Sequence, residues 1–352
     1  MIHKRDNDTM RHLITVLLLL LPALAAAVES HAVVFMYHRF GEERYPSTSV
    51  RIDQFEAHLD WLAGHGYTVW PLERIVQHLE TGAPMPDHTM AITVDDAYRS
   101  VYRHAFPRMV DRGWPFTVFV NTDSIDRQLP DYMTWEQMRE MQAHGVRFAS
   151  HGLKHNALWR RQAGESAARW RARVRDELAT AQARLQAELG PQTAHSPALF
   201  AYPYGEYTLA LAALVKELGY VAFGQHSGAI GTTSDPRALP RYPMAERYAS
   251  VEEFATKAAS LPLPVAALEP AEPLVQENPP RLTITLAEHA PALSTVRCYT
   301  GGDALRVVPV GERRFLIQAE RPLPKGRSRY NCTAPDASGR RYHWFSQPWI
   351  IP

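Results

Sequence analysis

The chain has 352 residues, of which 45% are hydrophobic and 21% charged, a composition typical of a globular protein with a sizeable core. Its 38 lysines and arginines nearly balance 37 acidic residues, for a net charge of +1, which excludes the basic field that a nucleic-acid partner needs. The length fits one large domain and a smaller one.

Residues 1–27 have the pattern of a secretory signal peptide. Lys4, Arg5 and Arg11 precede the apolar run Leu13 to Ala27, which ends in small residues. This run is shorter than the roughly 20 residues that span a bilayer, and the rest of the chain has no second apolar span. No cysteine lies near the cleavage region, so a lipoprotein is not expected. We expect an exported protein, periplasmic or secreted, with no stable membrane span after processing.

From residue 28 to residue 260, short apolar runs alternate with amphipathic stretches. The runs predict buried parallel strands at 32–37, 90–94, 116–120, 146–150 and 198–203. The stretches predict helices within 53–66, 98–113, 134–145, 164–190 and 208–219, most of which end in glycine. This order predicts an α/β barrel or a doubly wound sheet, and in either fold ligands bind at the carboxyl ends of the strands.

The last quarter of the chain has a different texture. Residues 261–280 are rich in proline, which predicts a semi-rigid linker or a segment strapped over the first domain. Residues 281–352 contain short β-type runs separated by turn residues, which predicts a small all-β, sandwich-like module. The only cysteines, Cys298 and Cys332, both lie in it. In an exported chain, a disulfide is favoured over two unpaired thiols.

Two pairs of polar residues follow predicted strands. Asp95 and Asp96 end the run 90–94; one of them could cap the next helix, but this leaves the second carboxylate unexplained. His151 and His155 follow the run 146–150. Histidines at i and i+4 can lie on one face of a helical turn and present their nitrogens to the same point.

The combination of these pairs predicts a metal site. An aspartate and two histidines at two strand ends of one domain would give a two-histidine, one-carboxylate site with positions open for water and substrate. A third stretch, Tyr202, Pro203 and Tyr204, lies in a turn after another strand. We expect the two tyrosines to be exposed as one wall of a substrate groove and a backbone N–H to meet an oxyanion there.

The motifs "TVDDAY", "SHGLKH" and "FAYPYG", in this order, resemble the first three motifs of the polysaccharide deacetylases, carbohydrate esterase family 4. The resemblance covers about residues 32–260. It implies a distorted (β/α)7-type barrel that removes acetyl groups from chitin, peptidoglycan or exopolysaccharide. "FMYHRF" and the tyrosine of "FAYPYG" are most similar to the branch that deacetylates poly-β-1,6-N-acetylglucosamine in biofilms.

The resemblance also implies a role for each site residue. Asp96, His151 and His155 would hold the metal, and Asp95 would be the general base. Zn²⁺ is the expected ion, with another divalent transition metal as the alternative, because imidazole and carboxylate suit zinc and zinc lowers the pKa of its water. The backbone N–H of Tyr204 would help to hold the oxyanion.

The sequence departs from the family pattern at two points. Ala201 stands where many members have an arginine that orients the base, so Arg241 is a candidate to supply this charge, the alternative being a surface arginine. No late leucine-x-histidine motif precedes residue 261. His38, at the end of the first strand, is favoured as the proton donor over His226, which is expected to be solvated in a glycine-rich loop.

We therefore expect a zinc-dependent N-deacetylase whose partner is an N-acetylated polysaccharide, poly-β-1,6-N-acetylglucosamine first and peptidoglycan or chitin oligomers second. One rival is a metal-independent barrel glycosidase that uses Asp95 or Asp96. Another is a non-catalytic polysaccharide-binding or matrix-assembly protein. The sequence leaves open whether the terminal module binds glycan, a protein of a polysaccharide-export complex, or only the barrel.

Overall fold

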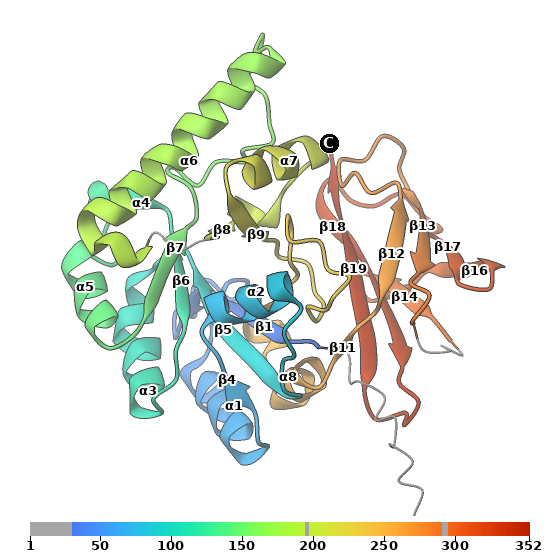
Figure 1. Ribbon diagram of the computed structural model, residues 1–352, viewed down its shortest axis with the longest axis horizontal. Helices are drawn as coiled ribbons and strands as arrows, with labels where there is room; N and C mark the ends of the chain where they lie inside the picture. Colours follow the sequence, from blue (N-terminus) through green and yellow to red (C-terminus); the bar gives the residue numbers. More distant parts are fainter. Residues whose placement is uncertain (1–29, 194–196, 291–294) are drawn as a thin grey trace, which may run out of the picture.

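The computed structural model describes residues 30–193, 197–290 and 295–352, so the expected signal peptide, 1–27, lies outside the described residues. A curled α/β sheet with helices around it lies beside an all-β module (Figure 1). No helix in these described ranges is long and apolar enough to cross a membrane.

The first part is a curled parallel sheet. Its strands follow the order β10-β1-β5-β6-β7-β8-β9, with β4 beside β5, and every pair is parallel. The predicted barrel-like fold with seven strands is confirmed as a curled half-barrel. The strand bounds are β1 (Val33–Tyr37), β4 (Thr68–Val69), β5 (Thr89–Asp95), β6 (Thr117–Val120), β7 (Arg147–Ser150), β8 (Ala198–Ala201), β9 (Tyr220–Phe223) and β10 (Tyr242–Pro243), and a separate small pair consists of β2 (Arg39–Phe40) and β3 (Ser49–Val50).

Helices begin where the sequence supplies caps. The side chains of Thr134 and Gln137 form a capping box at the start of α5, and Ser166, Thr208 and Ser250 accept backbone hydrogen bonds at other helix starts. The helices are α1 (Ile52–Gly64), α2 (Leu72–Thr81), a π-helical turn at Val101–Ala105 that leads into α3 (Phe106–Asp111), α4 (Thr122–Asp126), α5 (Trp135–Ala143), α6 (Ala167–Leu189), α7 (Leu209–Glu217) and α8 (Val251–Ala258).

The sheet is buried on both faces. In β1, Phe35 and Tyr37 belong to the core cluster that includes residues of α1 and α8, whereas Val34 belongs to a second cluster with α2. Successive side chains of a strand point to opposite faces, so an uninterrupted apolar run is required for burial on both faces. Polar side chains are therefore concentrated where the strands end.

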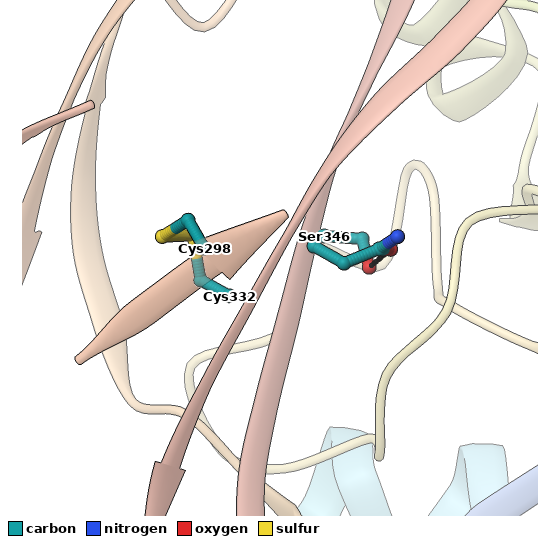
Figure 2. The surroundings of a disulfide bond; sticks show 4 residues. Cys298, Cys332 and Ser346 are labelled. Carbon is teal, nitrogen blue, oxygen red and sulfur yellow. Dashed lines mark hydrogen bonds between the residues drawn. A yellow bond between two sulfur atoms is a disulfide. The ribbon is translucent and has the colours of Figure 1, made fainter. Parts of the chain in front are cut away.

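The second part consists of two sheets packed over a shared apolar core, which confirms the predicted small all-β module. The five-stranded sheet has the order β11-β19-β18-β14-β15, and the four-stranded sheet has the order β12-β13-β17-β16. Cys298 and Cys332 are directly opposite each other on β14 and β18 and form the expected disulfide (Figure 2). The bounds are β13 (Arg281–Leu286), β14 (Arg297–Thr300), β15 (Asp303–Ala304), β16 (Arg306–Gly311), β17 (Arg314–Gln318), β18 (Gly326–Pro335) and β19 (Tyr342–Ile351).

The segment 261–280, expected as a linker or strap, instead contributes strands to both sheets of the module. Leu261–Pro262 (β11) pairs with β19, and Val265–Glu269 (β12) pairs with β13. The edges of the sheets offer unpaired backbone groups, and these pairings satisfy them. The proline content of the segment predicted the lack of helix but gave no sign of this pairing.

The module is docked tightly on the barrel. The ring of Trp344, on β19, meets the ring of Tyr242, on β10, edge to face at 5.2 Å. Arg341 donates to the Asp87 carboxylate, at 2.8 Å from Nη1, and to the backbone oxygen of Ala259. The start of β19 and the residue just before it therefore contact the barrel directly.

Candidate active site

Strand β5 delivers the two aspartates to the carboxyl rim of the sheet. Asp95 is its last residue, and Asp96 and Ala97 follow with φ angles of 72° and 59°. Non-glycine residues rarely adopt this left-handed conformation. Neither aspartate caps a helix, because the next helical element begins only at Val101, after Ser100. The bend instead directs the two carboxylates into different surroundings.

The Asp95 side chain is completely buried and paired with an arginine. Arg241, itself 0% exposed, donates from Nη1 to Asp95 Oδ1 at 2.7 Å and from Nη2 to Oδ2 at 2.8 Å. The same guanidinium donates to Gly224 O at 3.0 Å and to Thr93 Oγ1 at 3.2 Å. Such a two-pronged pair fixes both the position and the charge of the carboxylate. Arg241 therefore supplies the charge that Ala201 lacks, and it is not a surface residue.

The pair keeps Asp95 ionised. Burial alone raises the pKa of this carboxyl, but the permanent charge of Arg241 outweighs burial and holds the pKa below its ordinary value. His38 follows β1, and its Nε2 lies 4.0 Å from Asp95 Oδ2. Burial lowers the pKa of His38, although Asp95 and Asp96 oppose the change. A neutral imidazole therefore lies beside an ionised carboxylate.

Asp96 meets two histidines instead. Its Oδ1 lies 3.1 Å from His155 Nε2 and 3.5 Å from His151 Nε2, and the potential ligand atoms of these three residues all lie within 4.8 Å of one another. His151 Nδ1 is 2.8 Å from the backbone oxygen of Ala201. A carbonyl oxygen only accepts hydrogen bonds, so Nδ1 carries a proton and Nε2 is the nitrogen left for a second proton or a metal ion.

This donor set fits a divalent transition metal. In the described part of the chain, the buried Nε2 of His151 has no hydrogen-bond partner, and it faces an ionised carboxylate. Burial lowers the pKa of His155 to about 4, so this ring is neutral and able to ligate. Burial also lowers the pKa of His151, but Asp95 and Asp96 together raise it above its ordinary value. The cluster thus attracts a positive charge, and two imidazoles with a carboxylate are ligands for zinc and similar ions.

The two histidines converge without a helix. They lie in an irregular segment after β7, in which Gly152 and His155 have φ angles of 80° and 55°. The expected helical turn is therefore wrong, although the pair itself is brought together as predicted. The left-handed residues fold the segment back on itself, so that both rings reach Asp96.

The turn after β8 separates its two tyrosines. Tyr202 is 0% exposed, and its hydroxyl donates to the backbone oxygen of Arg237 at 2.8 Å. It lies on the same face as Phe200, two residues earlier, in the core beside α7. The expectation that Tyr202 is exposed and lines a groove is therefore wrong.

Tyr204 does lie at the rim. It is 41% exposed, and its ring meets the ring of His155 edge to face at 4.4 Å. It belongs to a single 3-10 turn, Pro203–Gly205, and has a φ of 60°. The hydrogen bonds of this turn run from Gly205 N–H to Tyr202 O and from Glu206 N–H to Pro203 O. Among the described residues the Tyr204 N–H has no hydrogen-bond partner, and the Tyr204 ring lies against His155, a residue of the candidate metal site.

Sequence reasoning missed two amides and misplaced one histidine. Asn121, after β6, donates to Asp96 Oδ1 at 3.4 Å, and Gln225, after β9, donates to Asp95 Oδ2 at 3.4 Å. For Asn121 the available signal was its position directly after the predicted strand 116–120, whereas Gln225 follows β9, a strand that the sequence analysis did not predict. His226 is buried rather than solvated, and burial lowers its pKa to about 3.

The fold and the site together define a class of domain: a parallel α/β half-barrel with an Asp-His-His cluster at the carboxyl rim of its sheet. The comparison with known families is consistent with this class. Residues 82–223 match the polysaccharide deacetylase family. The matched residues include Asp96, His151 and His155, so the similarity to this family covers the candidate metal site.

Three relatives make the likeness more specific. A Bacillus subtilis protein named "Putative polysaccharide deacetylase YxkH" is 33% identical over 123 residues, which cover 35% of this chain and 42% of that protein. The poly-β-1,6-N-acetyl-D-glucosamine N-deacetylase of Escherichia coli is 27% identical over 238 residues, which cover 59% of this chain and 35% of that protein. The structure of IcaB from Ammonifex degensii is 25% identical, with a TM-score of 0.55, over 65% of this chain and 97% of that chain. The chain spans less than half the length of the two curated relatives.

Proposed function

We propose that the protein is a metal-dependent hydrolase that removes N-acetyl groups from an N-acetylglucosamine polysaccharide. One observation carries this proposal: His151 Nε2, which has no hydrogen-bond partner among the described residues, lies close to the His155 ring and the Asp96 carboxylate. Next to them is a second carboxylate, Asp95, which Arg241 keeps ionised. One carboxylate is thus available to hold a cation and the other to accept a proton.

Each residue has a task that its surroundings support. Asp96, His151 and His155 would hold the ion; zinc, our preferred ion, would make a coordinated water more acidic and polarise the acetyl carbonyl. Asp95 accepts the proton of the attacking water, because it is ionised and fixed by Arg241. His38, 4.0 Å from Asp95 Oδ2, takes up this proton and delivers it to the leaving amine. The Tyr204 N–H faces the oxyanion.

The preferred substrate is poly-β-1,6-N-acetylglucosamine. Support comes from the likeness to the Escherichia coli N-deacetylase, which is named for this polymer, and from the "FMYHRF" segment at the end of β1. Peptidoglycan and chitin oligomers are the second choice. We further propose that the protein is exported, to the periplasm or the medium, where it acts on biofilm polysaccharide beside export proteins. Residues 1–27 are the observation that supports export.

The glycosidase alternative fits the site less well. It needs a carboxylic acid with a raised pKa to protonate the leaving sugar, whereas the pKa values of both Asp95 and Asp96 are lowered. The non-catalytic alternative rests on the missing arginine of the third motif and on the missing late histidine. Arg241 supplies the charge of the arginine from another part of the chain, and we propose that His38 takes the place of the histidine.

The test is acetate release from β-1,6-linked N-acetylglucosamine oligomers by the mature protein, from about residue 28. Chitin oligomers and peptidoglycan are assayed in parallel, each with added zinc and with a chelator. We expect zinc-dependent acetate and a free amine on the oligomer, with the sugar chain uncut. Polymer cleavage insensitive to chelator would establish the glycosidase. No acetate from any of the three substrates, with metal bound, would overturn the proposal.

A further inference from the structure

The C-terminal module presents two arginines to the rim of the candidate active site. Arg327 and Arg329 are two residues apart on β18, so they point to the same face. The alternate residues Tyr330 and Cys332 lie in the core of the module. The arginine face is therefore the outer one, and it meets the barrel.

Both arginines contact loops that carry site residues. Arg327 Nη1 donates to Tyr204 O at 2.7 Å and to Gln225 Oε1 at 3.3 Å, and its guanidinium lies 5.8 Å from the centre of the Tyr204 ring. Arg329 Nη1 donates to Gln225 O at 3.1 Å. Gln225 in turn donates from Nε2 to Asp95 Oδ2 at 3.4 Å. One side chain of the module thus contacts both the turn with the candidate oxyanion donor and the amide beside the base.

The two loops also press directly on each other. A Cβ added to Gly205, which follows Tyr204 with a φ of 69°, would lie 2.6 Å from the backbone N of Gln225. The glycine therefore permits a backbone approach that no other residue allows. The Tyr204 conformation, with a φ of 60°, is uncommon for a residue with a side chain, and the hydrogen bond from Arg327 holds the carbonyl of this strained peptide.

We infer that Arg327 is a positioning residue for the reaction, and that the C-terminal module completes the active site of the barrel. Arg327 holds the Tyr204 turn and the Gln225 side chain in the arrangement that serves the oxyanion and Asp95. This inference rests on the proposed function where it concerns catalysis. Its structural half, the restraint of the turn, can be measured without any substrate.

The activity arm compares Arg327→Ala with Arg297→Ala, which removes an exposed arginine from β14 of the same sheet. We expect Arg327→Ala to lower kcat by about tenfold to a hundredfold with KM changed by less than about threefold, the pattern of a lost transition-state arrangement. Arg327→Lys, which keeps one donor and the charge, should restore part of the loss, and added methylguanidinium should restore part of it in the alanine variant. Arg297→Ala should match the natural chain.

The structural arm measures hydrogen exchange of the whole metal-loaded protein. The Gly205 and Glu206 amides are both hydrogen-bonded within the turn. In Arg327→Ala they should exchange about tenfold faster than in the natural chain, and in Arg297→Ala their exchange rates should be unchanged. Faster exchange in a protein that deacetylates none of the three glycans would overturn the proposed function and leave the restraint of the turn intact. If the natural chain is active and Arg327→Ala has the same kcat and the same exchange rates as the natural chain, this inference is overturned. Equal unfolding midpoints of the two variants exclude misfolding as the cause of a loss.

Discussion

Asp95 and Asp96 are neighbours in the chain, yet each carboxylate has a different kind of positive partner. Asp95 is bonded on both oxygens to Arg241, which is permanently charged. Asp96 faces two imidazoles, one of which presents a bare nitrogen. A carboxylate with a fixed internal counter-charge is a stable, ionised proton acceptor, whereas one without it is a place for an external cation. The backbone bend at Asp96 is what separates the two environments.

The largest effect is expected when a residue of the proposed cation site is removed. We expect Asp96→Ala or His151→Ala to abolish stoichiometric zinc binding and to lower kcat/KM by about 10⁴-fold or more, since binding and water activation fail together. Metal content by mass spectrometry and acetate release provide the two readouts. His144→Ala, an exposed histidine at the end of α5, is the control. Full zinc occupancy in both ligand variants would contradict the assignment.

Removing the proton acceptor should leave the metal in place. Asp95→Asn is expected to lower kcat by about 10³-fold to 10⁴-fold, because the amide cannot accept the proton of water, with zinc content unchanged. Measuring metal content and turnover on the same preparation separates the two aspartates. Loss of zinc together with activity would show that Asp95 also ligates, and the division of roles would fail.

His38 lies next to Asp95 and is the proposed proton donor. We expect His38→Gln to lower kcat by about 10²-fold by removing the proton donor to the amine, again with zinc retained. An aryl ester or activated amide, whose leaving group needs no proton, should be hydrolysed at nearly the natural rate. An equal loss on both kinds of substrate would argue against the donor role and for a merely structural one.

Arg241 should produce the smallest loss of activity and a large loss of stability. Arg241→Met is expected to lower kcat by about tenfold to a hundredfold and the free energy of unfolding by about 3 to 5 kcal/mol, since it leaves Asp95 buried without its partner. Arg237→Met, in the exposed pair with Asp235, should cost less than about 1 kcal/mol. Urea titrations at neutral pH measure both.

The stability difference should also depend on pH. The pKa of Asp95 is lowered in the folded protein, so its contribution to stability is present above the unfolded pKa and is lost as the pH falls through the folded pKa. The gap between Arg241→Met and the natural chain should therefore shrink in acid, as repeated urea titrations at decreasing pH would show. A gap that stays constant down to acid pH would mean that the pair does not carry this stability.

The sequence located most of the fold. The five predicted strands of the barrel and most of its long helices are present, since uninterrupted apolar runs and capped amphipathic stretches carry local signals. It missed the two-residue strands β4 and β10, and it missed β9, although this strand has four residues like β6, β7 and β8. It also missed α2 and α8. The pairing of β11 and β12 was missed as well, because proline-rich composition describes the local chain and not the sheet edge that it meets.

For the site, the sequence by itself determined that Asp95, Asp96 and the two histidines stand at strand ends on one rim, because parallel strands share their carboxyl edge. Only the tertiary structure decided the partners. Arg241 is 146 residues from Asp95, and Arg327 is 123 residues from Tyr204. Such contacts leave no local pattern in the chain, because they depend on how the sheet curls and how the terminal module docks. Packing likewise buried Tyr202 and exposed Tyr204, two tyrosines that look alike in the sequence.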